Sequence, residues 1–95
     1  MTKADLVKIV SDKTGMTRAE VSMVVDTLIE SIKNAVLDDE RIEIRGFGNY
    51  YLRKKKARIA RNPRTKAPVK IPDRIVPEFK ISRVFRREVD AVHNK

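Results

Sequence analysis

The stretch RKKKARIARNPRTKAPVKIP, residues 53–72, decides how this chain is organised. It holds nine Lys or Arg and no Asp or Glu. Successive side chains of a strand point to opposite faces, so a strand here carries charge on both faces and cannot pack either of them into a core. In its middle, Asn62 and Pro63 suit the first two positions of a type I turn, because proline presets φ and an Asn side chain bonds the following backbone.

The stretch is therefore predicted to form a β-hairpin arm that projects from a body, with Pro63 at its tip. A disordered basic loop is the alternative, and composition alone favours it. The apolar Ile59, Val69 and Ile71, together with the turn signal, favour the arm. A chain of 95 residues is one domain, and without the arm its body is near the lower size limit for an independent core. Oligomerisation is expected.

Charge is distributed unevenly along the chain. Residues 1–40 hold five Lys or Arg against eight Asp or Glu, and residues 41–95 hold seventeen against five. A basic half of this kind is typical of nucleic-acid binding and is also compatible with an anionic membrane surface. The absence of cysteine excludes disulfides and thiolate metal sites. No apolar leader or membrane-spanning run is present, so we expect a cytoplasmic protein.

Two helices are predicted before residue 40. Thr2 suits an N-cap and Gly15 a helix stop, which gives a helix over 3–14. Thr17 and Glu20 have capping-box spacing, and apolar residues then recur every three or four positions over 18–38. The hairpin resembles a helix-turn-helix, but its acidic outer face would repel phosphate. Its broad apolar face is expected to pack against a second copy of the chain.

The remaining elements complete an α-α-β-β-β-α order, which is an α+β fold. Residues 41–45 alternate as a half-buried strand does, and Gly46-Phe47-Gly48 breaks that strand. A second strand enters the arm and a third returns from it. Ser82 suits the N-cap of a last helix over 83–92, with Val84, Phe85, Val89 and Val92 expected to point inward.

The motifs Arg45-Gly46-Phe47-Gly48-Asn49-Tyr50 and Arg61-Asn62-Pro63-Arg64-Thr65, in this order, resemble the bacterial histone-like DNA-bending family of HU and integration host factor. The resemblance covers essentially the whole chain. It implies one domain over 1–95, with a helical dimerisation part (1–40), a three-stranded antiparallel sheet (41–80) carrying the arm (53–72), and a C-terminal helix (81–95). It also implies an intertwined homodimer, or a heterodimer with a paralogue, whose arms hold duplex DNA through the minor groove. This family is itself a known example of minor-groove binding with kinking side chains.

By that resemblance Pro63 is the residue that intercalates between base steps. The DNA-binding set that the resemblance implies lies along the arm, at its tip and at the flank of the body: Arg53, Lys55, Arg58, Arg61, Asn62, Pro63, Arg64, Lys66, Lys70, Lys80, Arg83, Arg86 and Arg87. Two positions depart from the family pattern. Lys66 stands where the family usually has Gly, and Ile81 where it often has Pro. If the tip needs a positive φ at residue 66, a lysine is unfavourable there.

The expected function is architectural: a nucleoid protein that bends and compacts duplex DNA with little base specificity. A site-preferring bender like integration host factor is the alternative, and an RNA-binding basic hairpin protein is a more distant one. A membrane-surface role is disfavoured, because the arm lacks an apolar stripe for insertion. Residues suited to catalysis are missing, so we expect no enzyme activity, cofactor, metal or small-molecule substrate.

Overall fold

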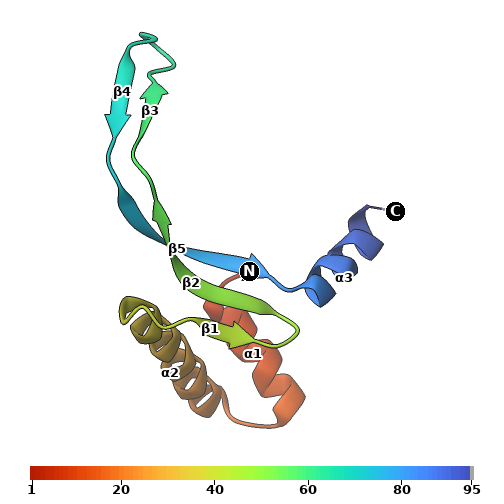
Figure 1. Cartoon of the computed structure of the whole chain (residues 1–95). Helices are drawn as coiled ribbons and strands as arrows, with labels where there is room; N and C mark the ends of the chain where they lie inside the picture. Colours follow the sequence, from red (N-terminus) through yellow and green to blue (C-terminus); the bar gives the residue numbers. More distant parts are fainter. Residues whose placement is uncertain (95) are drawn as a thin grey trace.

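Two N-terminal helices, a small antiparallel sheet, a long two-stranded arm and a C-terminal helix make up the computed structural model, which describes residues 1–94 (Figure 1). The α+β fold class is as predicted, with five strands among residues 1–94 instead of the three expected. The elements are α1 (Lys3–Thr14), α2 (Arg18–Leu37), β1 (Ile42–Ile44), β2 (Gly48–Lys55), β3 (Arg58–Arg61), β4 (Pro68–Ile71), β5 (Arg74–Ile81) and α3 (Arg83–His93).

The helix boundaries follow from local capping chemistry. Thr2 and Asp5 form a complete capping box at α1, and Gly15 ends that helix with a left-handed φ of 76°. The side chain of Thr17 accepts a hydrogen bond from the Glu20 amide, and that of Ser82 accepts one from the Phe85 amide. All three predicted starts are confirmed. α2 and α3 each end within one residue of the expected position.

The sheet has the strand order β1-β2-β5, with both pairings antiparallel. β3 and β4 pair only with each other and form the outer part of the arm. The second and third predicted strands are therefore each divided in two, β2 then β3 and β4 then β5, which the sequence did not reveal. Pro77 lies on β5, an edge strand, where a missing N–H is tolerated.

The arm extends far from the body (Figure 1). The Cα radius of gyration is 18.9 Å. A compact domain of this length would have about 12 Å. The ribbon therefore stands in solvent with both faces accessible, as the charge on both of its faces predicts.

The core of a single chain is very small. Val7 on α1 and Val21 on α2 are its only buried hydrophobic residues within 1–94. Leu28 on α2 is 56% exposed and Val92 on α3 is 67% exposed. The apolar faces of both helices are thus largely open in one copy, and the expectation that Val84, Val89 and Val92 point into a core is wrong for the isolated chain. Phe85 of α3 does contact the body, because its ring stacks on that of Phe47.

Aromatic rings join the sheet to α3. The ring centroid of Phe47 lies 5.0 Å from that of Phe79 and 5.8 Å from that of Phe85, and Tyr50 lies 4.6 Å from Phe79. Tyr50 thus belongs to the apolar face of the sheet, and Tyr51, its neighbour in β2, belongs to the opposite, polar face. The turn before β2 needs Gly46, whose φ is 80°.

Candidate nucleic-acid interface

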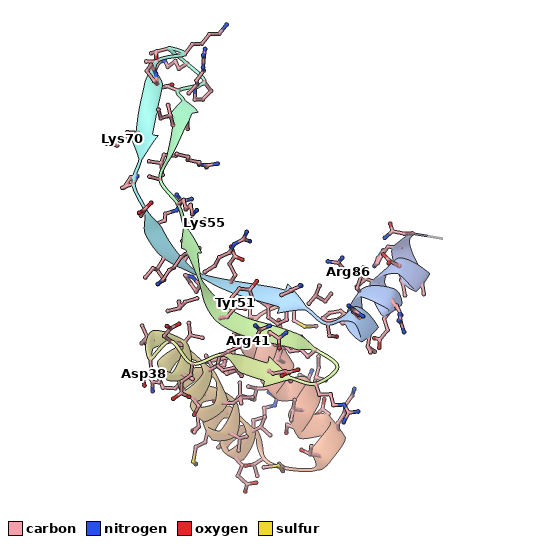
Figure 2. The ribbon with its side chains drawn as sticks, viewed as in Figure 1. Asp38, Arg41, Tyr51, Lys55, Lys70 and Arg86 are labelled. Carbon is pink, nitrogen blue, oxygen red and sulfur yellow. The ribbon has the colours of Figure 1, made fainter. Side chains whose placement is uncertain are left out.

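Cations lie along the whole arm. Arg53 and Lys55 are on β2, Arg58 and Arg61 on β3, and Lys70 on β4. In the β3–β4 ribbon, Arg58 pairs with Ile71 and Ile59 pairs with Lys70. Because side chains alternate, Arg61 and Lys70 share one face with Ile59, and Arg58 lies on the other. The structure therefore brings the predicted arm residues onto the same two-stranded arm (Figure 2, Lys55 and Lys70).

The tip of the arm is a four-residue loop from Pro63 to Lys66. The Asn62 amide donates to the Ala67 carbonyl at 2.9 Å, and the Lys66 amide donates to the Asn62 carbonyl at 2.7 Å. The Asn62 side chain accepts from the Arg64 amide at 2.9 Å, as the turn signal predicts. The loop closes one residue later than a type I turn would, since its bond spans four residues rather than three. Pro63 is exposed at the far end of the ribbon.

Lys66 adopts the backbone conformation that glycine prefers. Its φ is 61°, and Asp39 is the other non-glycine residue with positive φ among residues 1–94. A side chain at this φ costs about 1–2 kcal/mol relative to a right-handed conformation. The departure from the family pattern at this position therefore has a structural consequence: the lysine occupies a backbone conformation that glycine adopts without this cost, and it strains the loop.

At the base of the arm, a carboxylate lies among the cations. Glu78 on β5 is 3.4 Å from Arg53 Nη1 and 3.6 Å from Lys55 Nζ, and the Tyr51 hydroxyl lies 3.4 Å from the same carboxylate. The Arg41 guanidinium lies 5.4 Å from the centre of the Tyr51 ring, close enough for a cation–π contact. Two predicted DNA-binding residues are thus already engaged by an acidic neighbour.

The predicted body residues lie at the opposite end of β5 from the arm. Lys80 is near the end of β5, and Arg83, Arg86 and Arg87 are exposed on the first turns of α3 (Figure 2, Arg86). None of them has an acidic partner in the described part of the chain. The structure places them well away from the arm tip, so they form a second cationic area rather than an extension of the first.

Sequence reasoning missed several residues near the arm. Glu78 and Asp73 were overlooked because each is a single acid outside the basic stretch. Cross-strand register, which pairs Glu78 with Tyr51, is what reveals the first of them. Lys54, Lys56 and Arg74 surround Asp73 in a groove at the middle of the arm. No cluster of three metal-ligating side chains occurs within residues 1–94, and no helix in that range is long and apolar enough to cross a membrane.

A two-stranded cationic arm on a small α+β body, with a second cationic area on its last helix, defines an architectural DNA-binding protein rather than an enzyme. The family model described as "Bacterial DNA-binding protein" matches residues 1–90. This chain belongs to that family, the group of HU and integration host factor.

Relatives and solved structures agree with this assignment. The DNA-binding protein HU of Thermotoga maritima is 38% identical over 89 residues, which cover 94% of this chain and 99% of that protein. The integration host factor subunit beta of Alkalilimnicola ehrlichii is 39% identical over 92 residues, covering 96% and 92%. The Anabaena HU–DNA cocrystal structure has a TM-score of 0.82 and 35% identity, and covers 94% of this chain and 97% of that one.

Proposed function

We propose that two copies of this chain form an HU-type dimer that holds duplex DNA between its arms, enters the minor groove with their tips and kinks the duplex at Pro63. The observation that carries this proposal is the arm itself: a cationic ribbon that ends in a closed loop with Pro63 at its extremity. A rigid, apolar ring at an exposed tip is suited to enter an unstacked base step, which costs a few kcal/mol that the longer wrapped contact offsets.

The proposed contacts are sorted by their position. Pro63 is the intercalating residue, and Asn62 and Arg61 accompany it in the groove. The other side chains are positive and would meet phosphate and sugar, which fix position without reading sequence. These are Arg53, Lys55, Arg58, Arg64, Lys66 and Lys70 from the arm, and Lys80, Arg83, Arg86 and Arg87 from the flank of the body.

Arm length suits this role. From Arg53 to Asn62 the chain covers about 33 Å at about 3.3 Å per residue. One turn of duplex DNA rises about 34 Å, so each arm can follow roughly one turn of the groove. If the dimer neutralises about 6–10 phosphates, its affinity falls about 10³–10⁵-fold between 50 and 200 mM salt.

The dimer is supported by the open apolar faces. Met23, Val24 and Leu28 on α2 are 67%, 58% and 56% exposed in one chain, and they line a shallow apolar groove. Three adjacent side chains of this size are rarely left in water by a folded protein. A second copy covers them, and residues 1–40 are then the dimerisation part of a single domain.

Low base specificity is supported by the scarcity of base-reading groups. Residues 53–72 contain one Asn, no Gln and no acid. The side-chain oxygen of that Asn62 is already used by the Arg64 amide. Selection should therefore rest on DNA shape and flexibility, and flexible, nicked or pre-kinked duplexes should bind best. A general packager in the nucleoid fits this property better than a site-preferring bender.

The test is an energy-transfer measurement on a ~35 bp duplex labelled at both ends, which is shorter than the persistence length of DNA. Saturating wild-type protein should raise the transfer efficiency strongly, and Pro63→Ala should lower that rise while binding persists. Pro68→Ala is the matched control, because it removes a proline from β4 instead of the tip. Salt-sensitive binding without approach of the ends, or stronger binding to structured RNA than to the duplex, would overturn the proposal.

A further inference from the structure

The arm contains a joint, residues 56–57 and 72–73, at which neither strand is paired with the other in the β-ladder. The inner ladder ends with Lys55 paired to Arg74, and the outer ladder begins with Arg58 paired to Ile71. Two residues separate these pairs on each strand. The register is therefore the same above and below the joint, and no residue has been inserted. The joint is a gap in pairing and not a β-bulge, which would add a residue to one strand.

The residues at the joint explain why pairing stops. Pro72 has no N–H to donate to the opposite strand. Ala57 lies opposite Pro72 in the continuous register, and its amide donates instead to the side-chain carboxylate Oδ1 of Asp73. One side chain thus replaces a backbone partner and ties the two strands together where the ladder cannot.

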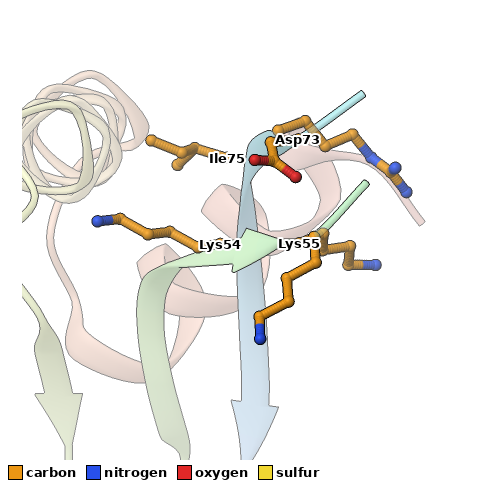
Figure 3. Close-up of a pocket in the computed structure, with 6 residues that line it drawn as sticks. Lys54, Lys55, Asp73 and Ile75 are labelled. Carbon is orange, nitrogen blue, oxygen red and sulfur yellow. The ribbon is translucent and has the colours of Figure 1, made fainter. Parts of the chain in front are cut away.

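The surroundings of Asp73 are strongly basic. Lys54, Lys55, Lys56 and Arg74 line the same groove (Figure 3). Even so, Asp73 forms no ion pair within residues 1–94, and its carboxylate instead accepts a hydrogen bond from the backbone amide of Ala57. A negative charge in the arm weakens the attraction to phosphate. We therefore look for the role of Asp73 in its hydrogen bond and not in its charge.

We propose that Asp73 is a positioning residue: its bond to Ala57 fixes the angle between the outer ribbon and the base of the arm, and so determines where Pro63 meets the duplex. This inference rests on the proposed function. The tip lies about six residues beyond Ala57, or about 20 Å. A change of about 10° at the joint then moves Pro63 by about 3.5 Å, which is about one base step. With a flexible joint, Pro63 would enter different neighbouring base steps in different complexes, and the position of the kink would vary.

Two substitutions separate the hydrogen bond from the charge. Asp73→Asn removes the negative charge and keeps an oxygen acceptor, whereas Asp73→Ala removes both. Both variants change the net charge equally, so any general gain in DNA affinity is matched between them. In the free protein, exchange of the Ala57 amide hydrogen should be about tenfold faster in Asp73→Ala than in Asp73→Asn, as loss of one hydrogen bond predicts.

On the ~35 bp end-labelled duplex at saturation, Asp73→Asn should keep the wild-type transfer efficiency. Asp73→Ala should give a lower mean efficiency and a broader single-molecule distribution, at an affinity equal to that of Asp73→Asn. Equal hydrogen exchange of the Ala57 amide in the two variants would show that the Asp73 side chain does not hold this amide. Equal bending of the duplex by the two variants would overturn the positioning role of Asp73. If the wild type fails to bend DNA, the proposed function fails, and the exchange comparison still decides whether Asp73 holds the joint.

Discussion

Arg53 on β2 and Glu78 on β5 form an ion pair at the base of the arm, with 3.4 Å between Nη1 and Oε2. The Arg53 side chain is 62% exposed and that of Glu78 is 25% exposed. Arg53 is the solvent-exposed partner, and ion pairs open to solvent contribute about 0–1 kcal/mol, so an arriving phosphate can displace the carboxylate. If Arg53 and Lys55 bind phosphate as proposed, Glu78 competes with DNA for Arg53 and, through its other oxygen, for Lys55.

Glu78→Gln should strengthen DNA binding. Arg53 and Lys55 then become free to neutralise phosphate, and each such contact steepens the slope of log affinity against log salt by about 0.9. A titration series from 50 to 200 mM salt measures this slope. Glu43→Gln is the matched control, because Glu43 lies in the same sheet without an ion pair in the described chain. Equal steepening in both variants would show that only net charge matters.

Lys66→Gly should order the arm tip. Glycine adopts the φ of 61° found at this position without the cost of a Cβ, and the gain should be about 1 kcal/mol in loop closure. The measurement is slower hydrogen exchange of the Asn62 amide, which closes the loop to Ala67. Lys66→Ala removes the same charge and keeps a Cβ, so it should not slow exchange. If Ala and Gly variants behave alike, backbone strain at the tip is absent.

Leu28→Glu should disrupt the dimer. Leu28 is 56% exposed in one chain, and covering this remaining half of a leucine contributes about 1–1.5 kcal/mol per copy. Burying a carboxylate in its place adds a further penalty. Sedimentation velocity should show the variant at a lower mass than the wild type, with a melting temperature that is lower. Asn34→Glu, which adds the same charge at an exposed position of α2, should sediment as the wild type does. Unchanged mass for Leu28→Glu would place the interface elsewhere.

Gly48→Ala should destabilise the fold. A Cβ at Gly48 would meet the backbone oxygen of Lys80 and would lie 2.6 Å from the Phe79 ring. Overpacking of this kind costs about 1–3 kcal/mol, which urea unfolding measures. Gly46→Asn is the contrast, because the space around Gly46 is open and Asn tolerates positive φ. A larger loss for Gly46→Asn than for Gly48→Ala would contradict this account of the turn.

Local signals in the sequence were sufficient for the helices and for the position of the tip, but not for the length of the tip loop. Thr2, Thr17 and Ser82 cap helices through bonds that involve residues only three positions away, so spacing alone predicts them. The turn at Asn62 is local for the same reason. The resemblance in the two motifs supplied the family and the proposed contacts, which composition and periodicity do not specify.

Contacts between distant residues were beyond prediction. Glu78 meets Arg53 across 25 positions, and Asp73 meets Ala57 across 16. Both depend on the exact pairing of two strands, and a shift of one residue would turn every side chain to the other face. In one chain Phe85 of α3 points inward as expected, but Val84, Val89 and Val92 do not, because periodicity identifies an apolar face and not the chain that covers it.

The gap in pairing leaves the register unchanged. The direction of the arm at the joint can therefore change without a change in the strand pairing of the outer ribbon. Substitutions at Lys56, Ala57, Pro72 or Asp73 can alter the stiffness and direction of the joint while every pair beyond it, from Arg58 to Arg61, keeps its partner. An inserted residue would instead exchange the two faces of the outer ribbon. If the joint positions the tip as proposed, a single replacement at the joint would change how sharply the duplex is deformed and would leave the tip chemistry intact.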